Sequence, residues 1–355
     1  MSQRDAAAID KNFATKGSIN KDCIKFYDAE QFDVYGVKLI DGVYRRMMAE
    51  DAAAINEKIF MISSEPAGGR VRFQTDSKRI AIYAEYRSIA KVPNYSYSAT
   101  IGFDLYSDER FVGVFVPPLD ITDSYESELI IPFDDGLMHE YTICFPVCSE
   151  VTKLLIGVTD DSKIEPGASY KVTTPVVFYG SSITQGSCSS HPGNSYENII
   201  CRALSCDYIN MGFWGNALGE EAMARYIAGM DMSAFVYDYD YNAPNPEHLR
   251  ATHERMFHIV REAQPTLPIV ILSAPKPYPT EQDDLRESII RQTYENARAA
   301  GDENVHFISG ARLIERVRDV ALADNVHPGD IGFMAMSDGL IPLLREILKL
   351  NQAKG

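Results

Sequence analysis

Two short segments of the sequence together contain a hydroxyl nucleophile and an acid–base pair. The segment Phe178–Gly186 reads FYGSSITQG and places Ser181 and Ser182 directly after a strand-like apolar run. Near the C-terminus, Asp324 stands three residues before His327 in the segment DNVHP. In a tight loop, an aspartate at this spacing can accept the Nδ1 proton of the imidazole and leave Nε2 free to take a proton from a serine. These residue types predict nucleophilic catalysis by a serine.

Each segment also has an ordinary structural interpretation. Gly-Ser-Ser sequences are common in turns between a strand and a helix, and an aspartate close to a histidine can simply cap a surface turn. Both segments, however, follow predicted strands of one sheet, so their joint occurrence is more informative than either alone.

Hydrogen-bond donors follow two further strand-like runs. Residues 210–216 (NMGFWGN) offer glycine N–H groups, and residues 238–244 (DYDYNAP) offer an asparagine amide. Donors directed at one point are what the oxyanion of a tetrahedral intermediate requires. Trp214 precedes Gly215, and its flat apolar face is suited to an acyl or sugar pocket, although packing in the core is the simpler interpretation.

The elements that would position these residues alternate between strands and helices after residue 172. The strand-like runs are 175–179, 208–212, 234–239, 268–273 and 305–309. The helical runs are 246–263, which follows Asn245 as a predicted N-cap, 285–300 and 331–350. This alternation predicts a parallel sheet covered by helices on both faces, with reactive groups at the carboxyl ends of the strands.

The first half of the chain has a different sequence pattern. Short β-branched and aromatic runs at 70–73, 80–86, 99–105, 110–116 and 141–145 are separated by turn residues. This spacing predicts an all-β antiparallel sandwich. A length of 355 residues favours two domains, and the polar stretch 160–171 is the best linker. We therefore predict an N-terminal domain over 1–170 and a catalytic domain over 171–355.

Composition excludes several classes of partner and cofactor. A net charge of -16 disfavours nucleic acid and anionic membranes. Six scattered cysteines fit reduced thiols, and the N-terminus has no signal-peptide pattern, so a cytoplasmic protein is expected. His248, His253 and His258 are spaced by five residues on one predicted helix and cannot share a face, so neither a metal site nor another cofactor is predicted.

Taken in order, the four strand-end segments resemble the SGNH (GDSL-type) hydrolase superfamily. The resemblance implies a flavodoxin-like three-layer α/β/α domain. It also implies that Ser182 is the nucleophile, that Asp324 and His327 are the acid and base, and that Ser182, Gly215 and Asn242 form the oxyanion hole.

A second resemblance lies in the first half of the chain. The segment Gly102–Tyr106 (GFDLY) is similar to the G-x-D-L-Y signature of the jelly-roll-like β-sandwich domain that precedes some SGNH esterase domains. From the residues alone, Asp104 is a buried aspartate on a strand, and we assign it a role in holding the fold rather than in catalysis.

Three positions depart from the superfamily pattern. Ser181 stands where aspartate is usual, Asp240 where glycine is usual, and Ala243 where aspartate is usual. Two of these flank Asn242, which makes Asn245 the alternative oxyanion donor.

Similar two-domain members act on acylated carbohydrates. The resemblance therefore implies a serine esterase for short-chain esters, above all acetyl esters, on sugars or oligosaccharides. The alternatives are an acyl thioesterase or lysophospholipase with the same triad, and a non-catalytic carbohydrate-binding relative. Whether the protein forms a homo-oligomer is left open.

Overall fold

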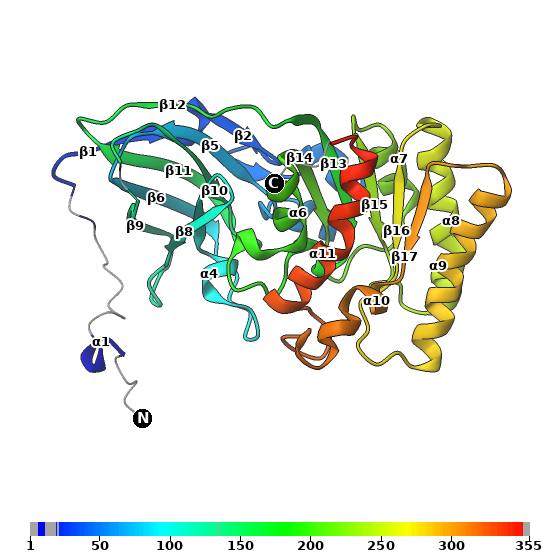
Figure 1. Cartoon of the computed structure of the whole chain (residues 1–355). Helices are drawn as coiled ribbons and strands as arrows, with labels where there is room; N and C mark the ends of the chain where they lie inside the picture. The colour runs from blue at the N-terminus through cyan, green and yellow to red at the C-terminus, as the bar shows by residue number, and fades with distance from the viewer. Residues whose placement is uncertain (1–5, 11–18, 20, 134, 351–355) are drawn as a thin grey trace.

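The computed structural model describes residues 6–10, 19, 21–133 and 135–350 (Figure 1). The N-terminal part is a sandwich of two antiparallel sheets. The first sheet has the order β1-β11-β6-β9, formed by β1 (Ile24–Asp28), β11 (Glu150–Thr159), β6 (Arg79–Ser88) and β9 (Ser124–Ile130). The second has the order β12-β5-β10-β7-β8, formed by β12 (Ile164–Pro166), β5 (Arg70–Thr75), β10 (His139–Cys144), β7 (Phe103–Ser107) and β8 (Arg110–Phe115), with β2 (Asp33–Tyr35) paired to β5.

Alternation along the strands explains the core of the sandwich. One buried cluster contains Val71 and Phe73, two residues apart on β5. It also contains Ile80 and Ile82, two residues apart on β6. Side chains two residues apart on a strand point to the same face, so each sheet presents an apolar face to the other. Smaller elements in this part are the hairpin β3 (Lys38–Ile40) and β4 (Val43–Arg45), the short helices α1 (Ala6–Ile9) and α4 (Tyr97–Thr100), and the turn η2 (Ala29–Gln31).

The C-terminal part is built on a five-stranded parallel sheet with the order β14-β13-β15-β16-β17. Its strands are β13 (Val172–Gly180), β14 (Cys206–Gly212), β15 (Ala234–Asp238), β16 (Ile269–Leu272) and β17 (Val305–Ile308). The connecting helices are α5 (Ser182–Gln185), η3 (Pro192–Asn194), α6 (Tyr196–Leu204), α7 (Glu221–Ala228), α8 (Pro246–Ala263), α9 (Glu281–Ala299), α10 (Gly310–Ile314), η4 (Glu315–Val320) and α11 (Asp330–Ile347).

Helices cover both faces of this sheet. Val177 and Tyr179 of β13 belong to the hydrophobic cluster that α7, α8 and α9 complete. Val176 and Phe178 belong to the opposite cluster, which includes residues of α6 and α11. The predicted three-layer α/β arrangement is confirmed. None of the helices in the described part of the chain is both long and apolar enough to cross a membrane.

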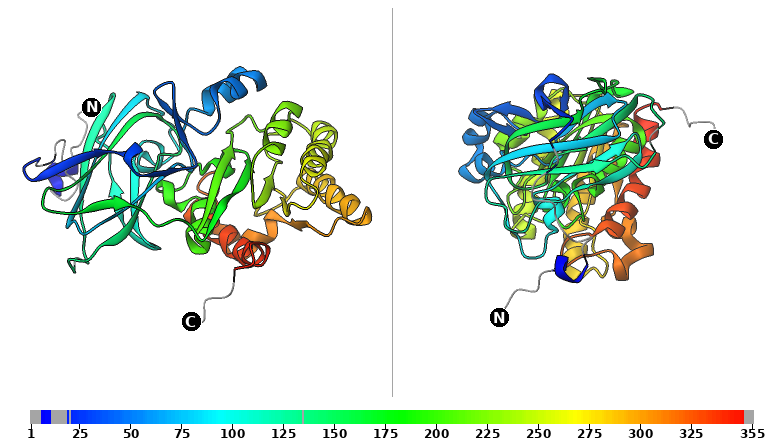
Figure 2. Two further views of the ribbon diagram at one scale, coloured as in Figure 1. Left: turned by 90° about the horizontal axis from the view of Figure 1, so that it is seen from above. Right: turned by 90° about the vertical axis from the view of Figure 1, so that its left-hand side faces the viewer.

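The N-terminal part is β-rich but not all-β as predicted. Residues 49–62 form the helices α2 (Ala49–Ile55) and α3 (Glu57–Ile62). Ala52, Ile59 and Ile62 are buried in the same cluster as the α7–α9 face of the parallel sheet. Figure 2 shows the ribbon of these helices in two further views. An N-terminal segment therefore completes the core of the C-terminal part.

Two further predictions need correction. The first residues of the predicted strand 99–105 lie in α4, and the strand β7 begins only at Phe103. The predicted linker 160–171 contains β12, which pairs with β5 and extends the second sheet. The boundary at residues 170 and 171 stays a prediction.

Candidate active site

The predicted nucleophile, base and acid form one continuous chain of hydrogen bonds. Ser182 Oγ lies 2.8 Å from His327 Nε2, and His327 Nδ1 lies 2.8 Å from Asp324 Oδ2. Ser182 is the first residue of α5, immediately after β13. With the Nδ1 proton donated to the carboxylate, Nε2 is left as the acceptor for the serine hydroxyl.

Glycines at two strand ends make the turn that presents Ser182. Gly180 ends β13 and is paired with Gly212 at the end of β14. A Cβ atom on Gly180 would lie 2.1 Å from Thr184 Oγ1, and one on Gly212 would lie 2.3 Å from the backbone nitrogen of Gln185. Because α5 packs directly on these positions, only glycine fits there. Ser181 is the N-cap of α5, and its Oγ accepts the N–H of Ile183 at 3.1 Å.

The loop that carries Asp324 and His327 is closed by hydrogen bonds of its own backbone. The N–H of Ala323 donates to the carbonyl of His327 at 2.8 Å, and the N–H of Gly329 donates to that of Ala321 at 2.9 Å. Asp324 Oδ1 accepts the N–H groups of Val326 and His327, each at 2.7 Å.

These bonds decide the charge of Asp324. Burial acts to raise the pKa of its carboxyl, but the hydrogen bonds from His327 and Val326 outweigh it and hold the pKa well below the usual range. Asp324 is therefore ionised at neutral pH, as a group that stabilises an imidazolium must be.

The predicted oxyanion donors lie in the loops after β14 and β15. Gly215 has a φ of +71°, and no atom lies within 4 Å of where its Cβ would be, so its surroundings are open. Asn242 Oδ1 accepts the N–H of Ala217 at 3.2 Å, which directs the amide oxygen to that side and leaves Nδ2 as a donor. The N–H of Ser182 is in the first turn of α5, where helical bonding does not use it.

Asn245 is the helix N-cap that the sequence predicts. Its Oδ1 accepts the N–H of His248 at 2.8 Å, and it is the N-cap of α8. Trp214 is half-buried against the hydrophobic cluster of the sheet, and its backbone N–H donates to Gln185 Oε1 at 3.2 Å. The roles of Gly215, Asn242 and Trp214 in binding stay predictions.

The N-terminal part supplies contacts that sequence analysis missed. Arg46 is buried and donates to the carbonyls of Gly212 at 2.5 Å and Ile62 at 2.9 Å. These bonds connect the end of β14, where the loop containing Gly215 begins, to the end of α3. Burial lowers the pKa of Arg46 to about 10, so the guanidinium remains charged at neutral pH. Gln185 of α5 donates to Glu65 Oε2 at 2.6 Å.

A second set of contacts from the N-terminal part reaches Asp324 and His327. Asn94 Nδ2 donates to Asp324 Oδ2 at 2.5 Å, although the two residues are 230 positions apart. The ring of Tyr95 meets the imidazole of His327 edge to face, with centroids 5.6 Å apart. No local pattern in the sequence marks Asn94 or Arg46, because each is defined only by a distant partner.

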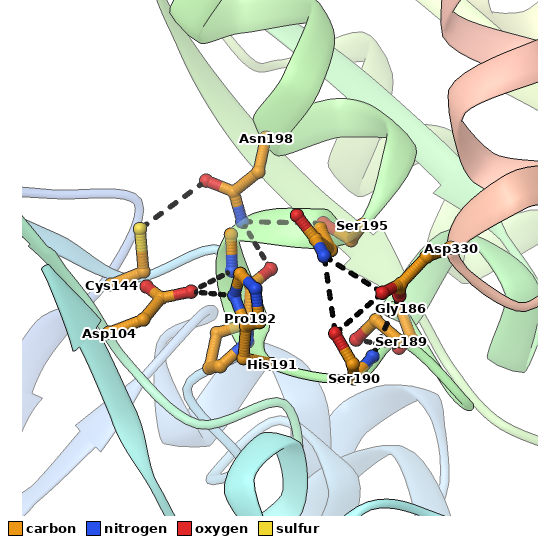
Figure 3. A network of polar contacts seen from close by, with 12 residues as sticks. Asp104, Cys144, Gly186, Ser189, Ser190, His191, Pro192, Ser195, Asn198 and Asp330 are labelled. Carbon is orange, nitrogen blue, oxygen red and sulfur yellow. Dashed lines mark hydrogen bonds and ion pairs between the residues drawn. The ribbon is translucent and has the colours of Figure 1, made fainter. Parts of the chain in front are cut away.

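The loop after α5 is held from both sides (Figure 3). On one side, Asp104 of the GFDLY segment is fully buried and its Oδ2 accepts from His191 Nδ1 at 2.5 Å and from the N–H of Gly193 at 2.7 Å. On the other, Asp330 at the start of α11 accepts from the N–H of Ser190 at 2.8 Å and from Asn194 Nδ2 at 3.0 Å. Asp104 thus has the fold-holding position expected of it, at the contact between the two parts of the chain.

Comparison with known proteins agrees with this architecture. Residues 173–345 match the sequence model of the GDSL-like lipase/acylhydrolase family, and residues 24–164 match the model described as the N-terminus of SGNH-hydrolase-type esterases. A search of curated proteins found no match.

Several solved structures share the fold over nearly the whole chain. A protein described as a GDSL-like lipase from Bacteroides ovatus has a TM-score of 0.83 and 25% identity, with 92% of this chain and 99% of that chain covered. A salicylyl-acyltransferase from a tetracycline biosynthetic pathway has a TM-score of 0.73 and 17% identity, with coverage of 92% and 98%. An acetyl xylan esterase from the rumen bacterium Butyrivibrio proteoclasticus has a TM-score of 0.60 and 13% identity, with coverage of 92% and 99%.

The two family models account for the two parts of the chain, in the order that the strand-end segments and the GFDLY segment predict. The chain belongs to the GDSL-like (SGNH-type) acylhydrolases that carry a GxDLY N-terminal domain, and it is a hydrolase of ester bonds.

Proposed function

We propose that this hydrolase removes short acyl groups, above all acetyl, from esterified sugars or oligosaccharides, with Ser182 as the nucleophile. The observation that carries the proposal is the uninterrupted chain of hydrogen bonds from Ser182 through His327 to Asp324. A carbohydrate-binding protein that had lost catalysis would have no need of such a chain, least of all with the acid ionised.

In the proposed reaction, His327 Nε2 takes the proton of the Ser182 hydroxyl as Oγ attacks the ester carbonyl. The N–H groups of Ser182 and Gly215 and the Nδ2 of Asn242 donate to the oxygen on which negative charge develops. The intermediate then collapses, and the departing alcohol takes the proton from His327. Water attacks the acyl-enzyme by the same route, which releases the carboxylic acid and restores the serine.

Charge favours a neutral acyl acceptor. The chain has 50 acidic and 34 basic residues, a net charge of -16. Coenzyme A thioesters and lysophospholipids with anionic head groups carry negative charge, so the field of the whole protein opposes their approach, whereas it does not oppose a sugar. The similarity of the fold to an acetyl xylan esterase is a further reason to test acetylated sugars first.

A substrate panel tests the proposal. Acetylated xylo-oligosaccharides and acetylated monosaccharides are compared at equal concentration with butyryl and octanoyl esters, an acyl-coenzyme A and a lysophospholipid, with Ser182→Ala as the blank. We expect the highest kcat/KM for an acetylated sugar. A faster thioester or lysophospholipid would overturn the substrate class, and no turnover of any ester would overturn the catalytic proposal. Glycerol added to the assay tests whether an alcohol competes with water for the acyl-enzyme.

A further inference from the structure

The loop 89–96, which joins β6 to α4 in the N-terminal part, reaches the acid of the triad. Asn94 lies at the solvent-exposed end of this loop, and its Nδ2 donates to Asp324 Oδ2 at 2.5 Å. The same oxygen accepts from His327 Nδ1 at 2.8 Å. Asn94 therefore binds the oxygen that must stay directed at the imidazole.

Asn94 is one of the N–H donors to the Asp324 carboxylate. Oδ1 accepts two backbone N–H groups of its own loop, and Oδ2 accepts from His327 Nδ1 and Asn94 Nδ2. The thiol of Cys188 also lies beside Oδ2, with Sγ 3.7 Å away. An ionised carboxylate has about four lone-pair directions, two on each oxygen. Three of the four N–H donors belong to Val326 and His327, and Asn94 supplies the fourth from the other part of the chain.

Contacts from both parts of the chain hold Asn94 in place. The N–H of Ala90 donates to Ser149 Oγ at 3.0 Å, and the N–H of Tyr95 donates to the carbonyl of Val92 at 3.1 Å. On the other side, Cys188 Sγ donates to the carbonyl of Asn94 at 3.5 Å. The side chain of Tyr95 packs on a small buried cluster formed by Ala67, Ala99, Val147 and Cys148.

We propose that Asn94 is a positioning residue of the catalytic acid, so that the N-terminal part of the chain completes the active site. Its amide fixes the rotation of the Asp324 carboxylate about its Cβ–Cγ bond, and thereby the orientation of the imidazole that accepts the Ser182 proton. The inference rests on the proposed function, because it assigns Asn94 a role through the triad rather than in contact with substrate.

Three titratable side chains near Asp324 and His327, those of Cys188, Tyr95 and Tyr241, are neutral near physiological pH. Burial and the nearby Asp324 charge raise the pKa of the Cys188 thiol to about 12. Burial also raises the pKa of Tyr95 and of Tyr241, which faces the loop from the end of β15. Lys276 is farther out, with its ammonium 4.3 Å from the centre of the Tyr241 ring. A new charge at position 94 would therefore act on the imidazole without a competing ionisation among these residues.

Two variants and a matched control test the proposal on an acetyl-ester substrate. Asn94→Ala removes the donor, and Asn94→Asp keeps the shape but replaces the donor with a negative charge. Asn296→Ala removes an equivalent amide, which donates to Glu254 Oε1 at 2.8 Å between α9 and α8, away from the triad. We expect Asn94→Ala to lower kcat about tenfold with KM within about twofold, since a charge-assisted bond to the acid is lost. The control should match the wild type.

The pH dependence separates positioning from a structural role. Because a nearby negative charge favours imidazolium, Asn94→Asp should move the rising limb of kcat/KM to higher pH by about half a unit to one unit. The midpoint of this limb does not depend on the amount of folded enzyme, so a less stable variant still gives an answer. Wild-type kcat in Asn94→Ala together with an unmoved limb in Asn94→Asp would overturn the inference. If Ser182→Ala also kept wild-type activity, the proposed function would fail instead.

Discussion

The two parts of the chain contribute to the active site in different ways. The C-terminal part supplies the groups proposed to react, each from the end of a strand or from a loop beside it, as with Ser182 and His327. The N-terminal part supplies side chains that hold those groups, such as Arg46 beneath the loop after β14 and Asn94 beside Asp324. The N-terminal part, in which sequence analysis places no catalytic residue, is therefore part of the structure of the site, and the two contributions should respond differently to mutation.

The largest effect is expected at Ser182, the proposed nucleophile. Ser182→Ala should lower kcat/KM by about 10⁴-fold to 10⁶-fold, because the covalent route is lost and only binding and the oxyanion donors remain. Steady-state kinetics on an acetyl ester and a thermal melt measure this. Ser181→Ala is the matched control, since it removes only the N-cap bond of α5 and should cost about 1 kcal/mol of stability while activity persists. An active Ser182→Ala with an inactive Ser181→Ala would exchange the two serines.

In the N-terminal part of the chain, the largest effect is expected for substitution of Arg46. The quantity affected is the stability of the fold. Arg46→Met leaves the buried carbonyls of Gly212, Ile62 and Glu65 without their donor. We expect a loss of about 3–5 kcal/mol in the free energy of unfolding, measured by denaturant titration. Arg87→Met, which removes an arginine bound to the carbonyl of Asp41 at the surface, should stay within about 0.5 kcal/mol. Equal losses in the two variants would contradict the supporting role of Arg46.

The next effect is expected in the C-terminal part, at the proposed oxyanion donor Asn242. Asn242→Ala should lower kcat by about a hundredfold to a thousandfold, roughly 2.7 to 4 kcal/mol, with KM nearly unchanged, because the bond is made chiefly in the transition state. Asn245→Ala should instead reduce stability by about 1 kcal/mol through loss of the α8 N-cap. Kinetics and melts on both variants decide the case. A loss of kcat in Asn245→Ala at unchanged melting temperature would exchange the two roles.

A smaller, pH-dependent effect is expected at Asp238, a supporting group within the C-terminal part. Its buried Oδ2 accepts from Thr184 Oγ1 at 2.9 Å and Tyr196 OH at 3.1 Å. Burial raises the pKa of Asp238 to about 7, against about 3.9 for an unfolded aspartate. The folded state thus binds more protons over this interval, and the contribution of Asp238 to stability is lost as pH rises from about 4 to 7.

Asp238→Asn keeps an acceptor and removes the ionisation. The stability of the variant relative to the wild type should therefore increase over this pH range, on the order of 1–2 kcal/mol once relaxation around the charge is allowed for. Urea titrations at pH 5 and pH 8 measure the difference. A stability difference that does not change with pH would show that Asp238 ionises as an ordinary carboxyl.

Local signals in the sequence predict most of the C-terminal fold. The helix expected over 246–263 has these bounds in the structure, because Asn245 and Pro246 give a strong start signal. The strand-end segments also predict that Ser182, Asp324 and His327 meet, since the carboxyl ends of parallel strands share one edge. These are short-range patterns on a regular scaffold, and a single sequence contains them in full.

The N-terminal part is harder to predict for a physical reason. The segment Ala49–Ile55 (AEDAAAI) is rich in helix-forming residues, which is the signal that identifies α2 among strands. By contrast, nothing near Asn94 or Arg46 distinguishes them from other polar residues. Their partners are 230 and 166 positions away, and only the packing of the two parts brings them together.

Covalent labelling identifies the nucleophilic residue itself. The native protein is treated with a fluorophosphonate, and the adduct is located by mass spectrometry of its peptides, with Ser182→Ala and His327→Ala treated in parallel. We expect one adduct on Ser182, none in Ser182→Ala, and slow labelling in His327→Ala because the general base is missing. An adduct on Ser181, or equal labelling of the His327→Ala protein, would contradict it.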